Sequence, residues 1–287
     1  MQNYQIITDS CCDLPAETIA SCGLTVIQLN LHFRGKTLPD NTGDEIKVMY
    51  DALRGGESAS TSAVNPEGWA SVIEPALSAG QDALVLAFSS GLSTTYQSAV
   101  IAANELKEKY PERTVQVVDT LCASLGQGLL VWYACRKRDE GMSLDELAAW
   151  CEKTKMNLSH WFTVDDQMYL KRGGRIGTAT ALLGTMLNIK PVLHMDNEGH
   201  LISVSKARGR KAAIDALAAK VSALGLPGEN ETMFISHGDC IDDARYLEKV
   251  LKEKYGAKEV LINYVGAVIG SHAGPGTLAL FFLGKER

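Results

Sequence analysis

The stretch that decides the fold is Phe88-Ser89-Ser90-Gly91-Leu92-Ser93-Thr94-Thr95-Tyr96-Gln97-Ser98-Ala99. Ahead of it, residues 83–88 form a short apolar run with the length of a buried strand. Behind it, residues 99–106 predict a helix. A strand, a turn of small residues and a helix start together form the crevice at which open α/β sheets bind their ligands.

The turn in this stretch is rich in hydroxyl groups. Backbone N–H groups at a helix N-terminus attract anions, and Ser93, Thr94 and Thr95 add hydroxyl donors. Ser93 could instead simply cap the helix. Because several hydroxyls exceed what one cap needs, the stretch favours an anion site.

Working outward, the N-terminal residues predict a parallel arrangement. Residues 4–8 predict a first strand, and Pro15 suits the first position of a helix over 16–21. Residues 24–33 predict one long second strand, followed by a tight turn at 34–36. This β-α-β order is typical of a parallel sheet.

The next segment offers a second pair of hydroxyls. A helix is predicted over residues 45–54, and residues 55–66 are small, polar and typical of a loop. Thr61 and Ser62 lie near the end of that loop, before a helix over 67–79. Taken alone, the pair is better explained as helix capping.

Polar residues recur where the predicted strands end. Residues 114–119 predict another buried strand, which runs into a hydroxyl-bearing turn and two further helices ending near Arg138 and Thr154. Three strands thus end in polar turns, at Asp9-Ser10, Ser89–Ser93 and Asp119-Thr120. In a parallel sheet such ends lie along one edge, where ligands bind.

The second half follows a different pattern and predicts an α+β domain. Its expected order is β-ββ-α-β-α-β, with strands over 160–164, 190–195, 201–204, 232–236 and 259–263 and helices over 208–224 and 241–255. Residues 179–186 predict a small buried helix. Near the end, residues 268–277 surround His272 with three glycines and a proline, which indicates a constrained turn before a strand over 278–282.

Composition limits the class of protein. A chain of 287 residues, 46% hydrophobic and 22% charged, corresponds to about two ordinary globular domains. We expect an N-terminal mostly parallel α/β domain over 1–158 and an α+β domain over 159–287. Whether the last strand, 277–283, packs with the second domain or elsewhere stays open.

Charge and cysteine usage exclude several function classes. A net charge of −6 argues against a nucleic-acid partner. The N-terminus lacks a leader-like segment and no apolar run could span a bilayer, so a cytoplasmic location is expected. The seven cysteines are odd in number and show no C-x-x-C spacing, which predicts neither a metal site nor a disulfide framework.

The chain resembles a known family through motifs spread along nearly its whole length. They are Thr8-Asp9-Ser10 with Asp13-Leu14, Thr61-Ser62 before Pro66, residues 89–99, Val118-Asp119, residues 169–177, Lys190-Pro191 and His272-Ala273-Gly274-Pro275-Gly276. Together, and in this order, they resemble the DegV family of bacterial fatty-acid-binding proteins. The resemblance implies two α/β domains with a long-chain fatty acid buried between them.

The same resemblance implies a site and a partner. It assigns the fatty acid carboxylate to the hydroxyls of Thr61, Ser62 and Ser93, with His272 near the head group. It further implies a separate fatty acid kinase that makes the acyl phosphate, a place in fatty acid metabolism and phospholipid synthesis, and no catalytic residue, metal or cofactor in this chain. A transient encounter with a membrane is compatible with such a ligand.

Two departures from the family pattern matter. The family turn reads S-G-T-Y, whereas here Thr94 stands where glycine would allow a positive φ. The family's Thr-Ser pair is followed by proline after two residues, whereas Pro66 comes later. The sequence therefore leaves open which of Thr61 or Ser62 contacts the ligand.

Simple energetics support a lipid carrier. Each buried methylene contributes about 0.8 kcal/mol, whereas a buried carboxylate must be hydrogen-bonded. Hydroxyls and an imidazole would meet that need. Residues 179–186 and 278–282 are the expected tunnel walls.

Two other functions compete with this interpretation. Ser93 and His272 could be the nucleophile and base of a hydrolase, but the chain lacks G-x-S-x-G and its spacing places no acid. The strand-end site could also serve a phosphate- or sugar-binding regulator.

A last motif is basic and rich in glycine. Residues 168–177 match neither nucleotide-binding glycine pattern. With the family resemblance, Lys171, Arg172 and Arg175 are expected to form an adaptable loop that docks the kinase by steering the encounter.

Overall fold

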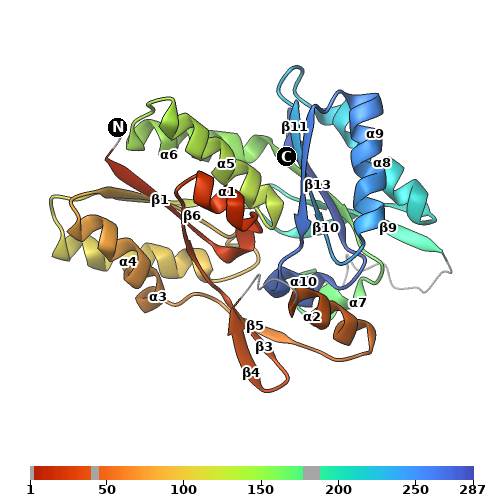
Figure 1. Cartoon of the computed structure of the whole chain (residues 1–287), viewed down its shortest axis with the longest axis horizontal. Helices are drawn as coiled ribbons and strands as arrows, with labels where there is room; N and C mark the ends of the chain where they lie inside the picture. Colours follow the sequence, from red (N-terminus) through yellow and green to blue (C-terminus); the bar gives the residue numbers. More distant parts are fainter. Residues whose placement is uncertain (1–2, 40–44, 177–187) are drawn as a thin grey trace.

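The computed structural model describes residues 3–39, 45–176 and 188–287. Its first layer is a parallel sheet. Its strands lie in the order β2-β1-β6-β7, with bounds β1 Tyr4–Asp9, β2 Thr25–Ile27, β6 Asp82–Ala87 and β7 Val115–Asp119. Both faces are covered, as parallel sheets require: Ile7 and Val85 pack toward one pair of helices, Ile6 and Leu84 toward another (Figure 1). The first pair is α3 Pro66–Ser78 and α4 Thr95–Lys109, and the second α5 Leu125–Asp139 and α6 Leu144–Thr154.

A second, mixed sheet forms the other half of the molecule. Its order is β10-β9-β8-β13-β11-β12, with bounds β8 Leu158–Thr163, β9 Ile189–Met195, β10 Leu201–Arg208, β11 Thr232–His237, β12 Glu259–Tyr264 and β13 Leu278–Leu283. One face packs against α8 Arg210–Leu224 and α9 Ile241–Tyr255. The expected fold class is confirmed, and the last strand lies inside this sheet, between β8 and β11. The division at residues 158 and 159 stays a prediction.

The N-terminal half also contains a small third sheet that the sequence did not predict. It has the order β4-β3-β5, with β3 Asn30–Phe33, β4 Lys36–Pro39 and β5 Ser60–Ser62. The prediction of one long strand over 24–33 is therefore wrong, because β2 and β3 belong to different sheets. The chain changes sheet at Leu29, which is buried and whose backbone N–H donates to the Ser10 hydroxyl at 3.0 Å. The expected loop over 55–66 is likewise interrupted by β5.

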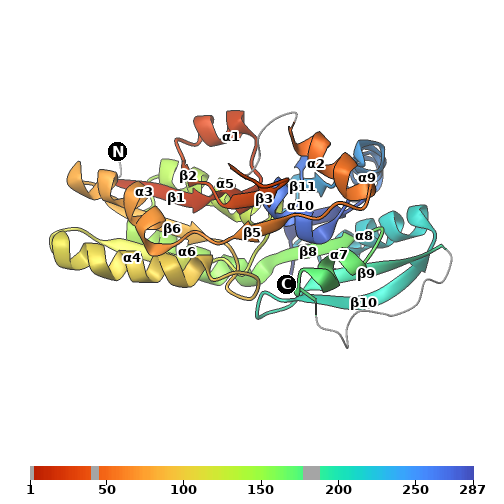
Figure 2. The same ribbon diagram turned by 90° about the horizontal axis from the view of Figure 1, so that it is seen from below.

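Two short helices replace expected irregular segments. The basic stretch includes α7, Met168–Arg172, so Lys171 and Arg172 lie on a helix and not in an adaptable loop. The glycine-rich tail includes α10, Ala267–Ala273, so His272 lies in a helix and not in a turn. α2, Glu45–Arg54, packs beside α10, as Figure 2 shows from below. The helix expected over 179–186 lies outside the described residues.

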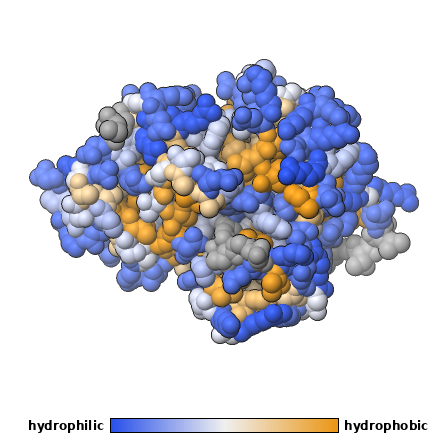
Figure 3. All heavy atoms as spheres, viewed as in Figure 1, coloured by the Kyte–Doolittle hydropathy of each residue, from blue (hydrophilic) through white to orange (hydrophobic). Residues whose placement is uncertain are grey.

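The remaining features concern short elements and the surface. α1 spans Ala16–Ser21, and 3₁₀ turns span Ser10–Cys12 and Lys155–Asn157. On the face shown in Figure 3, hydrophobic residues gather in separate patches among hydrophilic ones. No helix within the described ranges is both long and apolar enough to cross a membrane. The seven cysteines are free thiols, and six of them are buried.

Candidate ligand-binding site

A cavity of about 450 Å³ lies between the carboxyl edge of the parallel sheet and the inner face of the second sheet. This volume is in the range of pockets that hold small ligands. Its apolar lining comes from both halves and includes Leu29, Phe88, Leu92, Phe162, Leu170, Met195, Leu201, Val265, Val268, Ile269, Ala279 and Phe281. Its polar lining includes Thr61, Ser62, Ser90, Ser93, Thr94, Ser124, His160, Arg175, Ser236, His272 and Thr277.

The alternation of β13 decides which of its residues reach the cavity. Successive side chains of a strand point to opposite faces. Ala279 and Phe281 line the cavity, whereas the other three residues of the expected tunnel wall, Leu278, Leu280 and Phe282, pack toward α8 and α9.

The three strand ends come together as the sequence predicted, and their carboxylates hold the hydroxyl-rich turn. Asp9 Oδ2 accepts the backbone N–H of Phe88 at 2.7 Å, and Asp119 Oδ1 accepts that of Ser90 at 3.1 Å. Both carboxylates are buried. They are thus structural supports that fix the path of residues 88–93.

Ser93 lies at the N-terminal end of α4, at the wall of the cavity. Its Oγ accepts the backbone N–H of Thr95 at 3.2 Å and lies 2.8 Å from Thr95 Oγ1. Ser93 thus satisfies one backbone group of the first turn, while its side chain stays half-buried beside the cavity. Thr94 has a φ of −78°, so the turn needs no glycine there.

Thr61 and Ser62 point to opposite sides of β5. Thr61 Oγ1 lies 2.8 Å from His272 Nε2, whereas Ser62 Oγ lies 3.1 Å from His32 Nε2. Neither residue caps α3, because Asn65 performs that role by accepting the N–H of Gly68 at 2.9 Å. The structure therefore joins Thr61, and not Ser62, to the predicted histidine.

His272 occupies the last turn of α10 and is held neutral. Burial, and after it the positive charge of Arg175, lower the pKa of His272 from 6.5 to about 4. The ring packs against Gly173, where a Cβ would stand 2.5 Å from His272 Nδ1. Glycine at 173 is thus what allows the imidazole to lie so close to the end of α7.

The three cations of the basic stretch lie in different places, and of these Arg175 lines the cavity. Arg175 is half-buried in the cavity wall, where its Nε donates to Leu92 O at 3.2 Å and its Nη1 to Gly173 O at 2.6 Å. Arg172 is exposed and stacks on the Tyr169 ring, 4.6 Å from its centroid. Lys171 is half-buried at the end of α7.

Together these groups give the wall of a largely apolar cavity side chains that suit an anion. Arg175 supplies a positive charge, the N-terminus of α4 supplies a partial one, and Thr61, Ser93 and the neutral His272 supply hydrogen-bonding groups. Among the described residues, no group of three or more His, Cys, Asp and Glu side chains could hold a metal ion.

Sequence reasoning missed one polar cluster, in which Ser124 and Ser236 line the cavity and Asp13 supports them. Ser124 Oγ lies 2.5 Å from Asp13 Oδ2 and 2.9 Å from Ser236 Oγ, which ties the two halves of the molecule together. Ser124 has a φ of 55°, a sparsely populated conformation for a residue other than glycine. The sequence marks Asp13 and Ser124 as turn residues, but Ser236 reads as an ordinary strand residue.

Comparison with known proteins finds the same family along nearly the whole chain. Residues 3–285 match the family model described as "Uncharacterised protein, DegV family". A DegV domain-containing protein of Clostridium perfringens is 43% identical over 289 residues, covering 100% of this chain and 99% of its own.

Solved structures share the fold. One described as fatty acid binding of a DegV family protein from Thermus thermophilus has a TM-score of 0.89 at 35% identity, over 98% of this chain and 99% of that chain. A DegV lipid binding protein from Thermotoga maritima has a TM-score of 0.86 at 30% identity, over 100% of both chains.

Proposed function

We propose that this chain, which belongs to the DegV family, binds a long-chain fatty acid and presents its carboxylate to a fatty acid kinase. One observation carries the proposal: an apolar cavity of about 450 Å³ has Thr61, Arg175 and His272 side by side in its wall. Relatives whose structures are described as binding fatty acids or lipid support it.

The apolar wall would supply most of the affinity. Each methylene moved from water into the cavity contributes about 0.8 kcal/mol. A chain of more than a dozen carbons would therefore bind strongly, once the entropy of ordering it has been subtracted.

The polar end would offset the desolvation of the carboxylate. Thr61 and Ser93 would donate hydroxyl hydrogen bonds, and His272 would orient the Thr61 hydroxyl or donate directly. Ser62, on the other face of β5, would contribute to the wall and not to the head-group contact.

The partner in this proposal is a separate kinase. An exposed Arg172 at the end of α7 would steer the encounter with the kinase, with Lys171 beside it, and could contact the phosphates being transferred. Arg175 would act closer to the head group. A cytoplasmic location, a transient membrane encounter during lipid uptake, and two domains over 1–158 and 159–287 belong to the same proposal.

Identification of the bound lipid tests the proposal. Protein purified without detergent is extracted with organic solvent, and the extract is analysed by mass spectrometry. A stoichiometric long-chain fatty acid supports the proposal, and a fluorescent fatty acid should compete with it. An extract that holds only phosphorylated or sugar compounds would replace it with the regulator hypothesis.

The hydrolase hypothesis receives no support from the geometry. Within the described residues, Ser93 Oγ is hydrogen-bonded to Thr95 and His272 Nε2 to Thr61. Serine hydrolases instead join the nucleophile to the base. Incubation with activated esters, with Ser93→Ala as control, checks this directly.

A further inference from the structure

Thr61 belongs to a segment that leaves the parallel sheet and packs on the other half of the molecule. We call this segment the insert: β3, β4, α2 and β5, between the parallel strand β2 and helix α3. Figure 1 shows α2 beside α10 and α7, away from the helices of the parallel sheet. The site therefore depends on how the insert sits against α10, which carries His272.

The middle of α2 fixes that position by close packing. The Tyr50 hydroxyl donates to Val265 O at 2.7 Å, just before α10 begins. A Cβ at Gly270 would stand 2.3 Å from Tyr50 Oη, so α2 and α10 touch within two residues of His272. The Tyr169 hydroxyl donates to Leu53 O at 2.8 Å and ties α7 to the end of α2.

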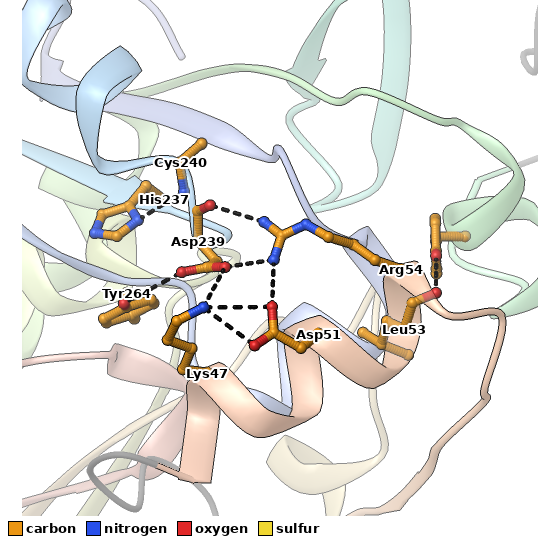
Figure 4. A network of polar contacts seen from close by, with 9 residues as sticks. Lys47, Asp51, Leu53, Arg54, His237, Asp239, Cys240 and Tyr264 are labelled. Atoms are coloured by element: carbon orange, nitrogen blue, oxygen red, sulfur yellow. Dashed lines mark hydrogen bonds and ion pairs between the residues drawn. The ribbon is translucent and has the colours of Figure 1, made fainter.

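An ionic cross-link completes the contact at the outer edge of α2. Arg54 Nη1 lies 2.5 Å from Asp239 Oδ2, and its Nη2 donates to Asp239 O at 2.9 Å (Figure 4). Lys47 adds a longer contact to the same carboxylate at 3.8 Å. Asp239 lies between β11 and α9, with its side chain only 15% exposed and its φ at 54°. Asp51 pairs with Lys47 and Arg54, but within α2 itself.

We propose that Arg54 and Asp239 form a latch that holds the insert against α10 and so keeps Thr61 in reach of His272. Both are positioning residues, since they act on the ligand only through β5 and α10. Release of the latch loosens the outer edge of α2 while Tyr50 still anchors its middle on α10. This loosening lets β5 move away from α10 when the ligand enters or leaves. The exchange step rests on the proposed fatty-acid function.

The experiment compares two isosteric changes on the same network. Asp239→Asn removes the charge that crosses to the other half, whereas Asp51→Asn removes a charge that stays within α2. Hydrogen–deuterium exchange is followed in the ligand-free protein for peptides covering 58–62 and 45–54. Dissociation of a fluorescent fatty acid is followed by stopped flow.

We expect Asp239→Asn to speed hydrogen exchange in 58–62 and to raise the dissociation rate about fivefold, because loss of a partly buried charge partner acts mainly on dissociation. Asp51→Asn should leave hydrogen exchange in 58–62 and the dissociation rate within about twofold of the parent, since exposed ion pairs on one helix contribute little to stability. Salt should speed dissociation from the parent toward the Asp239→Asn rate, because Arg54 is 42% exposed and open to screening. Arg54→Lys keeps the positive charge but loses one of the two contacts with Asp239. Its dissociation rate should lie between those of the parent and Asp239→Asn.

The latch is overturned if Asp239→Asn leaves hydrogen exchange in 58–62 at the rate of the parent. It is overturned too if Asp51→Asn changes exchange and ligand dissociation as much as Asp239→Asn does. Should Asp239→Asn fail to fold, Arg54→Gln on the exposed side of α2 provides the same test. If the protein binds no fatty acid, the proposed function fails. The latch is still tested in that case, because the hydrogen-exchange measurement needs no ligand.

Discussion

His272 and Ser93 show how single residues set the character of the site. Burial keeps the His272 imidazole uncharged near neutral pH, so its hydrogen bond with Thr61 joins two neutral groups. The positive charge beside them comes from Arg175, which lies in the cavity wall. Ser93 adds a hydroxyl at the N-terminus of α4.

Replacing Ser93 by alanine should weaken fatty-acid binding while the fold persists. A lost hydrogen bond to a charged group costs about 1.5–3 kcal/mol, which corresponds to about tenfold or more in affinity. Titration with a fluorescent fatty acid measures the effect. Ser71→Ala, an exposed hydroxyl on α3, serves as the control. An affinity equal to that of the parent would remove Ser93 from the site.

His272 should also contribute a pH dependence to stability. Its pKa in the folded protein is about 4, below the ordinary 6.5, so between these values the unfolded chain binds more protons. Stability should therefore fall as pH falls from about 6.5 to 4. In ligand-free His272→Gln, thermal midpoints should fall less steeply across this window. His237, whose pKa is also about 4, contributes a remaining slope together with His160 and His194, whose pKa values burial also lowers. Identical slopes for parent and variant would contradict this prediction.

At the scale of elements, β5 separates two hydroxyls that the sequence could not tell apart. Thr61 faces α10, and Ser62 faces His32 on β3. The two residues are neighbours in the chain, but the period of a strand places them on opposite sides.

Thr61→Val should therefore weaken fatty-acid binding by about tenfold, because valine keeps the shape of threonine and loses its hydroxyl. Ser62→Ala is the matched control and should change affinity by less than about threefold. Isothermal titration of both variants with the lipid found by extraction checks the difference. Equal losses in the two variants would show that the face of β5 does not decide the contact.

The elements also show what the sequence could and could not predict. β1, β6 and β7 were predictable because each is a short apolar run that ends in polar residues. The break between β2 and β3 was not, since residues 24–33 are uniformly β-like and only the fold shows where the chain changes sheet. α10 was mistaken for a turn because its glycine at 270, which suggests a turn, instead allows close packing on Tyr50. The pairing of Thr61 with His272 spans 211 positions, a separation that no local pattern reveals.

On the scale of the whole molecule, the cavity exists only where the two halves meet. One core cluster runs from Leu84 of the first sheet to Phe162 and Phe281 of the second. The C-terminal Arg287 donates to Lys155 O at 2.7 Å, which further joins the halves. Arg172 lies on the outside of this assembly, at the end of α7.

If the proposed kinase docks here, Arg172→Ala should keep fatty-acid affinity within about twofold and slow acyl-phosphate formation by that kinase at low salt. Charge steering acts on the association rate, so raising salt should slow the parent toward the variant. Kinase turnover is measured against carrier concentration at two salt concentrations. Lys249→Ala, an exposed cation on α9, is the control. Arg175→Ala should lower lipid affinity as well, because Arg175 lies in the cavity wall.

Turnover of Arg172→Ala equal to that of the parent at low salt, with lipid binding intact, would show that this end of α7 is not the docking element.

The alternation of β13 has a consequence for ligand selectivity. Ala279 and Phe281 border the cavity, while Leu278, Leu280 and Phe282 anchor α8 and α9. The residues that border the cavity and those that hold the helices alternate along one strand and face different neighbours. Substitutions at positions 279 and 281 can therefore change the size and shape of the cavity while the helical layer behind the strand keeps its packing. If the cavity holds the proposed fatty acid, its preference for chain length can diverge without a loss of stability.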